Sequence, residues 1–335
     1  MRSRLINAAV LCGSLLICLA GAEAMLRITN LSFPLGVQWI RTTSANLQSG
    51  FVYDPQTGWR MRPNNTFQWV REKITNDYRS NSQGFRSDRD FNPASPGFKM
   101  AFVGDSYTFG SGVAYEQTFA SLLENQASGR VAWDFAMPGF GIDQAWLATR
   151  YQILPNHPDL LVVGIVDADF ERSQISFRGV VKPVFRVVNG RLEEKKLSSP
   201  TRWQTYLYDN VRLWSMYMHA KQWMGRHYGI GEYWTLNQAI LDTLREDCRK
   251  AGVPVLFLYI PTKEFRAFPA LRQYMRRTGA EYIDLTEARS SPQGIYLPHD
   301  GHFNPAGHRY MAGLIEHWLE AHQFGSAATA RAASH

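Results

Sequence analysis

The stretch that decides the fold lies at residues 99–106 and reads KMAFVGDS. Residues 100–103 are short, uncharged and apolar, which is typical of a strand buried inside a sheet. Gly104 and its small neighbours allow a tight strand-to-helix turn from which Ser106 projects. Open α/β sheets place their ligand sites at the carboxyl ends of strands, so the position of Ser106 indicates a functional serine. A second interpretation stays open, in which Asp105 and Ser106 only cap a helix.

Strand and helix patterns alternate on the C-terminal side of this stretch. Apolar runs predict strands, and runs with a period near 3.6 residues predict amphipathic helices. The strands are expected over residues 131–135, 160–166, 253–260 and 282–285, and the helices over 117–125, 142–153, 236–248 and 305–319. This alternation predicts an α/β protein with a parallel sheet flanked by helices.

The 335 residues divide into four segments by pattern. Residues 1–27 read as an anchor, 28–98 as an extended lead-in, 99–323 as a catalytic domain, and 324–335 as a disordered tail. Residues 172–235 read as an insertion in the domain, with a possible hairpin around Asn189-Gly190 and a Trp-rich part after it. This insertion could shape a substrate groove, pack on a membrane or cover a sheet edge, and the last is the simplest role.

The N-terminal segment predicts a membrane anchor. Arg2 and Arg4 precede a mostly apolar run from Leu5 to Leu26, which is about long enough to cross a bilayer as a helix. The positive flank predicts a cytoplasmic N-terminus, and therefore a single-pass protein of a bacterial inner membrane whose remainder faces the periplasm. The alternative is secretion after cleavage near Ala22-Glu23-Ala24.

Composition excludes several classes of function. The net charge of +7 comes from dispersed Lys and Arg without a long basic run, so no nucleic-acid partner is expected. Cys12 and Cys18 lie in the apolar segment and only Cys248 lies in the globular part, so neither an intradomain disulfide nor a cysteine metal cluster is expected. The sequence has no P-loop and no dinucleotide-binding glycine motif, and it implies no cofactor.

A second group of reactive side chains lies near the C-terminus, at residues 297–305, which read LPHDGHFNP. Asp300 and His302 are two apart in an extended loop and therefore project to the same side. A nucleophilic serine needs a base and a group that orients that base, and this pair supplies both. Asn304 and Pro305 are typical of the start of a helix, which fixes where the loop ends.

A metal site is the competing interpretation of this loop. His299, Asp300, His302 and His308 are residue types that bind zinc. The sequence offers no second dense cluster of ligands, and His308 on the predicted helix is more simply a solvent-facing or packing residue. We therefore expect no metal.

The order of these motifs resembles the SGNH (GDSL-like) hydrolases. The resemblance covers roughly residues 50–322 and includes NSQGFR at 81–86, Phe109-Gly110 and PGFG at 138–141. It implies a flavodoxin-like, three-layer α/β/α sandwich and the transfer of an acyl group from an ester to water or to another alcohol. By resemblance, Ser106 is the nucleophile, His302 the base and Asp300 its orienting carboxylate, while Gly139 supplies an oxyanion N–H beside that of Ser106. Gly139 could equally serve only a tight turn.

Two features depart from the family pattern. Where the family has an asparagine that donates to the oxyanion, this chain has Ala168, and the neighbouring Asp169 cannot donate when ionised. Arg172 is a speculative substitute. The separation of Asp300 from His302 by one residue is shorter than in many relatives and is similar to that in alginate-acetylation proteins.

These patterns leave three hypotheses of function. The first is a serine-dependent hydrolase of an O-acylated cell-envelope carbohydrate, an exported polysaccharide or another ester. The second is an O-acyltransferase with the same acyl-serine intermediate. The third is a non-catalytic glycan-binding or assembly protein, which the missing asparagine favours and the ordered Ser, Asp and His oppose.

Overall fold

The computed structural model describes residues 2–29, 50–71, 74–174, 182–195, 203, 206–207, 210–217, 220, 230–261, 268–286 and 294–324. The chain forms two compact units. The first contains residues 1–47 and 198–230, and the second contains residues 48–197 and 231–335. The segment boundaries drawn from the sequence stay predictions, and the tail from residue 325 lies outside the described residues.

The second unit is built on a parallel sheet of five strands in the order β11-β10-β7-β5-β6. Counted along the chain, this is the order 2-1-3-4-5 read from the other edge, which is the flavodoxin-like order. The central residues of each strand are apolar, and each strand overlaps a strand that the sequence predicts. The strands are β5 (Phe98–Val103), β6 (Arg130–Asp134), β7 (Leu160–Ile165), β10 (Val255–Tyr259) and β11 (Glu281–Asp284).

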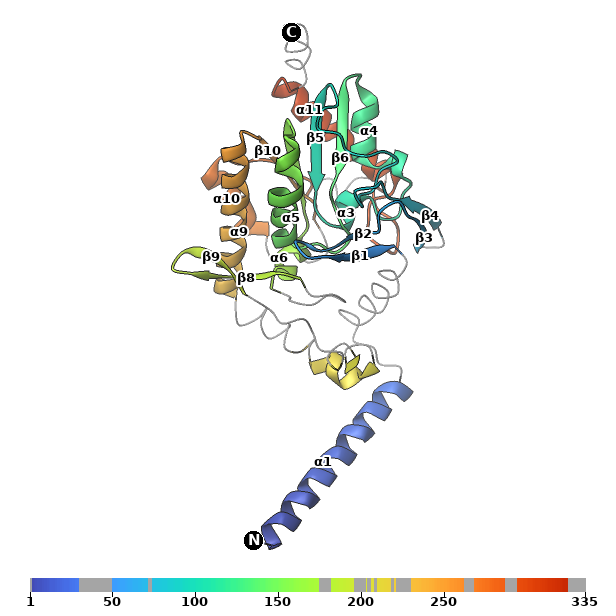
Figure 1. The fold of residues 1–335 in the computed structure, drawn as a ribbon, viewed down its shortest axis with the longest axis vertical. Helices are drawn as coiled ribbons and strands as arrows, with labels where there is room; N and C mark the ends of the chain where they lie inside the picture. Colours follow the sequence, from blue (N-terminus) through green and yellow to red (C-terminus); the bar gives the residue numbers. More distant parts are fainter. Residues whose placement is uncertain are drawn as a thin grey trace. The chain divides into compact units, whose positions relative to one another are not determined.

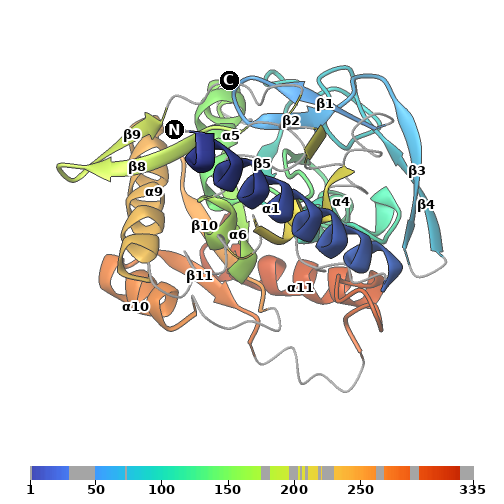
Figure 2. The ribbon, with the colours of Figure 1, turned by 90° about the horizontal axis from the view of Figure 1, so that it is seen from below.

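Helices cover both faces of this sheet (Figures 1 and 2). On one face lie α4 (Phe119–Gln126) and α11 (Pro305–Ala321). On the other lie α5 (Ile142–Ala148), which continues as a wider helical turn over Thr149–Ile153, and α9 (Ile230–Ala251). Beside α9 lies α10 (Phe268–Thr278), whose Tyr274 hydroxyl donates to Asp242 of α9. The predicted three-layer α/β/α sandwich is confirmed.

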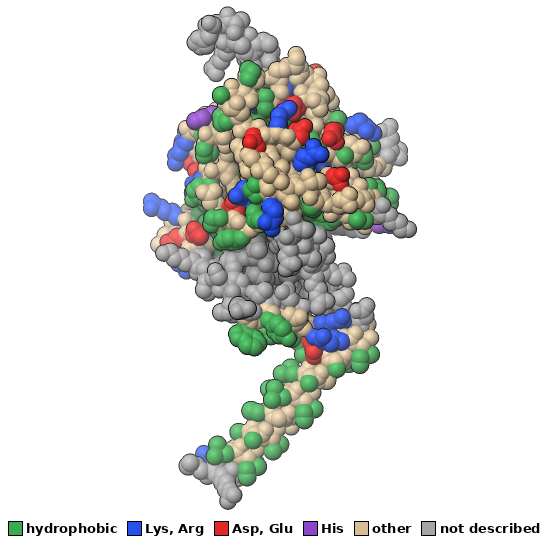
Figure 3. Space-filling view, turned by 45° about the vertical axis from the view of Figure 1, so that its right-hand side comes forward, with side chains coloured by type: hydrophobic (Ala, Val, Ile, Leu, Met, Phe, Trp, Pro, Cys, Tyr) green, Lys and Arg blue, Asp and Glu red, His purple; other side chains and the backbone are tan. Residues whose placement is uncertain are grey.

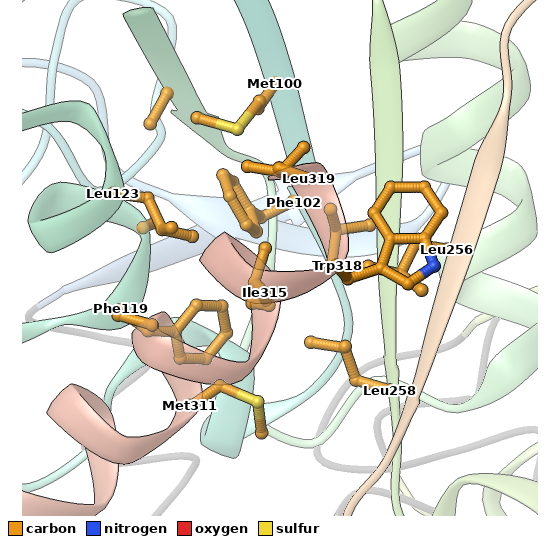
Figure 4. Packing of buried hydrophobic residues seen from close by; sticks show 14 of the residues in the cluster. Met100, Phe102, Phe119, Leu123, Leu256, Leu258, Met311, Ile315, Trp318 and Leu319 are labelled. Atoms are coloured by element: carbon orange, nitrogen blue, oxygen red, sulfur yellow. The ribbon is translucent and has the colours of Figure 1, made fainter. Parts of the chain in front are cut away.

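The core between the sheet and the first helix layer joins parts of the chain that are far apart in sequence (Figure 4). Side chains of β5 and β10 point into this layer and meet those of α4 and α11, and all of them are buried. Because apolar burial is the main favourable term in folding, this contact fixes α11 and the loop before it against the sheet. The cluster includes Met100, Phe102, Phe119, Leu123, Leu256, Leu258, Met311, Ile315 and Leu319.

Residues 50–98 have more regular structure than the extended lead-in that the sequence indicates. They contain two antiparallel hairpins, β1 (Phe51–Asp54) with β2 (Gly58–Met61), and β3 (Thr66–Arg71) with β4 (Ile74–Arg79). Their aromatic side chains do form part of a core, because Trp59 and Tyr78 are buried. Tyr78 stacks on Phe109 of the segment after Ser106, with ring centroids 5.5 Å apart.

The predicted hairpin in the insertion is present as β8 (Val184–Val188) and β9 (Arg191–Lys195). Asn189 and Gly190 both have positive φ, 49° and 74°, which is the two-residue turn that suits right-twisted strands.

The first unit contains α1 (Arg2–Ile28). Within residues 3–28 the most apolar 18-residue window has a mean hydropathy of 2.2, and none of that window is buried in the structure. This apolar helix fits either a membrane span or a signal anchor. Residues 212–217 of the same unit are helical.

The side chain of Arg86 connects residues 50–98, which contain the two hairpins, to the segment that follows Ser106. The side chain is fully buried, and its Nη1 donates to the Phe109 and Gly110 carbonyls at 2.6 and 2.8 Å. Its Nη2 donates to the Val113 carbonyl at 2.7 Å. The guanidinium also lies 4.4 Å from the centroid of the Tyr78 ring. One buried cation thus satisfies three carbonyls of a non-repetitive segment.

We predict that Arg86→Met lowers the free energy of unfolding by about 3 kcal/mol or more, because three buried carbonyls each lose the hydrogen bond from Arg86. Urea unfolding followed by circular dichroism measures this. Arg89→Met is the matched control, since Arg89 is exposed and pairs with Glu124. The control is expected to lose less than about 1 kcal/mol. Equal losses for the two variants would contradict this account of Arg86.

Candidate active site

The serine lies at the first position of a one-turn helix, α3 (Ser106–Phe109), directly after β5. Asp105 caps this helix, because its carboxylate accepts from the Tyr107 N–H at 2.9 Å. A Cβ on Gly104 would lie 2.4 Å from Thr108 Oγ1 and 2.8 Å from the Gly164 carbonyl oxygen. Glycine at residue 104 is therefore required by the close approach of β7 to the turn. Asp105 therefore caps the helix, and Ser106 also projects from the turn, so the two interpretations of this stretch are compatible.

The loop that contains Asp300 and His302 is distant from the serine in sequence and lies beside it in the structure. Tyr107 Oη donates to the Gly301 carbonyl at 2.9 Å, and the Tyr107 ring stacks on the imidazole of His302 with centroids 4.6 Å apart. Asn304 caps α11 by accepting from the Gly307 N–H at 2.9 Å, as the sequence predicts. Tyr107 therefore holds the loop beside the serine, and the cap at Asn304 fixes the residue at which the loop ends and α11 begins.

The structure brings the three predicted side chains into one hydrogen-bonded chain. Ser106 Oγ lies 2.7 Å from His302 Nε2, and His302 Nδ1 is hydrogen-bonded to Asp300 Oδ1. The side chains of His302 and Asp300 are each 13% exposed. With Nδ1 facing the carboxylate, the neutral ring presents its Nε2 lone pair to the serine hydroxyl. This geometry allows His302 to remove the Ser106 proton as Oγ attacks.

Two backbone N–H groups are available near the serine. Ser106 is the first residue of α3, so its N–H has no acceptor within the helix. Gly139 has a φ of 81° in a turn closed by the Phe140 N–H and the Met137 carbonyl at 3.1 Å. A residue at the third position of such a turn needs a positive φ, so glycine is favoured there. Among the hydrogen bonds of the described residues, neither the Ser106 nor the Gly139 N–H is a donor.

The structure places Arg172 where three parts of the site meet. Its Nη1 donates to Asp105 Oδ2 at 2.8 Å, to Asp169 Oδ1 at 2.7 Å and to the Phe140 carbonyl at 3.0 Å. These bonds connect the cap of the serine helix, the loop after Gly139 and α6 (Asp167–Arg172). The geometry supports a positioning role for Arg172, and it does not by itself make the side chain an oxyanion donor.

The residues at the expected asparagine position have other contacts. Ala168 packs against the hydrophobic core cluster and carries no donor. Asp169 accepts from the Val166 N–H at 2.9 Å and pairs with Arg172. Neither residue therefore offers a side-chain amide donor at this position.

The alternative metal site has no support in geometry. Among the residues that the structure describes, no group of three or more His, Cys, Asp or Glu side chains is arranged to hold a metal ion. His308 is 1% exposed, and its Nδ1 accepts from the Phe119 N–H at 3.2 Å. Burial lowers the pKa of His308 to about 3, so the ring is a neutral packing residue at the start of α11.

Sequence reasoning missed Tyr107 and the full role of Arg172. Both act through contacts with residues distant in the chain, 194 residues for Tyr107 and 67 for Arg172 with Asp105. The only local signal was that each residue lies within six residues of the end of a predicted strand.

Comparisons with known structures give a likeness of fold at low identity. The structure titled TesA is 14% identical, with a TM-score of 0.41 over 67% of this chain and 98% of that one. A GDSL-like lipase from Bacteroides thetaiotaomicron is 11% identical, with a TM-score of 0.41 over 67% of this chain and 88% of that one. The acetyl xylan esterase AlAXEase is 13% identical, with the same TM-score over 66% of this chain and all of that one.

No protein-family model matches the chain, and no curated protein matches it. These identities and TM-scores are too low to assign a chemical activity. The chemistry is therefore inferred from the geometry of the site itself.

We predict that Arg172→Lys lowers kcat by roughly tenfold or more with little change in KM, because the lysine side chain is one bond shorter and more flexible, so its nitrogen does not reach the position where Nη1 meets its three acceptors. Steady-state kinetics on a chromogenic ester measure this. Arg150→Lys is the control, since Arg150 makes a bidentate pair with Asp247 on the outer surface of α5 and α9. An unchanged kcat in folded Arg172→Lys would contradict the positioning role.

Proposed function

We propose that this chain is a serine esterase of the SGNH (GDSL-like) type, with Ser106 as nucleophile, His302 as general base and Asp300 as the group that orients the base. The observation that carries the proposal is the 2.7 Å contact between Ser106 Oγ and His302 Nε2, with Asp300 on the other ring nitrogen. A serine, an imidazole and a carboxylate in this chain are the arrangement that activates a hydroxyl for acyl transfer.

The first half of the reaction follows from these atoms. Ser106 Oγ attacks the ester carbonyl carbon while its proton moves to His302 Nε2, and Asp300 stabilises the imidazolium that forms. The negative charge on the carbonyl oxygen is stabilised by the N–H groups of Ser106 and Gly139. The bond to the alcohol oxygen then breaks, and that oxygen takes the proton from His302. The products are the free alcohol and an ester of Ser106.

The second half releases the acyl group by the same groups. Water gives a proton to His302 Nε2 and attacks the acyl-Ser106 carbonyl, with the oxyanion again facing Ser106 and Gly139. The Ser106 Oγ–acyl bond breaks, and Oγ recovers the proton. The net result is one ester and one water converted into one alcohol and one carboxylic acid, and the mechanism derived from these residues uses no cofactor.

For the substrate, we propose an O-acylated carbohydrate of the cell envelope or an exported polysaccharide. The support is the N-terminal apolar helix with its positive flank, which favours a bacterial inner-membrane anchor and a periplasmic catalytic unit. The short Asp300-Gly301-His302 spacing, similar to that of alginate-acetylation proteins, adds an analogy with exported glycans.

The same acyl-serine intermediate serves an O-acyltransferase, in which a sugar hydroxyl takes the place of water. The absence of an amide side chain at Ala168 affects both reactions alike, because both pass through the same oxyanion. Loss of one donor costs about 2.7–4 kcal/mol in other enzymes. Slow turnover with water and faster turnover with an added alcohol acceptor would identify the transferase.

We predict that the purified full chain hydrolyses short-chain p-nitrophenyl esters and that Ser106→Ala lowers kcat by roughly 10³-fold or more. Asp300→Asn is expected to lower kcat by a similar factor, because the imidazole loses its orienting carboxylate. Absorbance of the released nitrophenol measures both.

Ser121→Ala is the matched control, because Ser121 is a buried serine of α4 outside the site. It is expected to retain kcat. Turnover that survives in Ser106→Ala, or that falls equally in Ser121→Ala, would count against nucleophilic catalysis by Ser106.

A further inference from the structure

Glu23 is an acidic residue near the C-terminal end of the apolar helix α1. Its carboxylate accepts from the backbone N–H groups of Arg212 and Leu213, at 3.1 and 2.9 Å, and from Arg27 Nε at 2.8 Å. Residues 212–217 are helical, so Glu23 satisfies N–H groups that begin another helical segment. An acidic side chain at the end of an apolar helix is thereby paired in full with donors of its own unit.

Two further hydrogen bonds join the same parts of the chain. Arg27 Nη2 donates to the Asn210 carbonyl at 2.5 Å, and Arg212 Nη1 donates to the Leu26 carbonyl at 2.6 Å. The last turn of α1 and residues 210–213 therefore hold each other through side chains from both segments. This contact lies within the first compact unit.

The length of the apolar run places this contact at a membrane boundary. Leu5–Leu26 is 22 residues by its numbering, and at about 1.5 Å per residue it spans roughly 33 Å, close to the 30 Å hydrocarbon core of a bilayer. Arg4 lies just before this run and Arg27 just after it. If α1 crosses a bilayer, its last turn lies at the headgroup layer, and the residues hydrogen-bonded to it lie there as well.

Among the described residues between 203 and 217, three aromatic side chains are exposed. Trp203 is 75% exposed, Tyr206 is 54% exposed and Tyr217 is 52% exposed. Figure 3 shows hydrophobic side chains gathered beside the basic and acidic ones at this end of the helix. Tryptophan and tyrosine are enriched at membrane–water interfaces, where the ring is apolar and the N–H or O–H faces water.

We propose that the described residues between Trp203 and Tyr217 belong to a membrane-interface element, in which Trp203, Tyr206 and Tyr217 insert into the headgroup layer of a phospholipid bilayer and which is fixed to α1 through Glu23. The partner is the lipid surface that surrounds α1, because the exposed rings lie in the same unit as that helix and residues 210–213 are hydrogen-bonded to its last turn. This interaction surface goes beyond the proposed esterase activity, and it rests on α1 being a membrane span. A chain cleaved after Ala24 would lose Glu23 and with it this connection.

Depth-dependent fluorescence quenching of the full chain tests the proposal. Cys12→Ser and Cys18→Ser leave only the buried Cys248, and Trp203→Cys in this background takes a nitrobenzoxadiazole label. The chain is reconstituted in phosphatidylcholine–phosphatidylglycerol vesicles that carry a nitroxide either on the headgroup or at mid-chain. In a separate chain that carries only Cys12→Ser, a label on native Cys18 reports whether α1 lies in the bilayer, and in the double-serine background a label at Arg249→Cys reports an exposed charged site of α9.

We expect the headgroup nitroxide to quench the residue-203 label at least about twofold more than the mid-chain nitroxide does. Both nitroxides should leave the residue-249 label almost unquenched, and mid-chain nitroxide should quench Cys18. A quenched Cys18 label with an unquenched residue-203 label would overturn the interface element and leave the anchor intact. An unquenched Cys18 label would overturn both, whatever the esterase assay shows.

The Glu23→Ala variant tests the connection itself. It removes the acceptor for Arg212 and Leu213 N–H, so the residue-203 label is expected to lose about half or more of its headgroup quenching. Quenching unchanged by Glu23→Ala would overturn the role of Glu23.

Discussion

The requirement that Ser106 and His302 meet within hydrogen-bonding distance is the constraint that the arrangement of the second unit satisfies. Their hydrogen bond joins residues 196 positions apart at 2.7 Å. A parallel sheet makes this possible, because the carboxyl ends of all its strands lie at one edge and the loops after them meet there. Tyr107 then holds the histidine loop by its bond to the Gly301 carbonyl, and the packing of α11 against α4 and the sheet keeps the end of that loop in place.

Buried and partly buried cations organise the loops at this edge. These loops lack the repeating hydrogen bonds of helices and strands, so their carbonyls and carboxylates need other partners. Arg86 satisfies the segment after Ser106, Arg172 connects the serine turn with the Gly139 loop, and Lys182 is buried against Asp143 at the start of α5. Trp59 Nε1 adds a bond to the Pro138 carbonyl at 3.2 Å. The N-terminal hairpins thus stabilise the same loops that carry the proposed chemistry.

The sequence predicted what depends on local pattern. Apolar runs located β5, β6, β7, β10 and β11, and the 3.6-residue period located α4, α5, α9 and α11. The order of Ser106, Asp300 and His302 indicated which side chains come together, and the structure brings them together. The hairpins of residues 50–79, the stacking of Tyr107 on His302 and the contacts of Glu23 with residues 212–213 arise from long-range packing. No local period encodes such contacts, so they were visible only in three dimensions.

The most direct measurement of the central claim is the mass of the full chain after reaction with a fluorophosphonate, followed by peptide mapping. An activated serine attacks phosphorus and expels fluoride, which leaves one phosphonyl group on the protein. The account predicts a single adduct on the peptide that contains Ser106, formed at a rate that falls strongly in Asp300→Asn. An unmodified chain, or an adduct on a different serine, would contradict the assignment of Ser106 as the nucleophile.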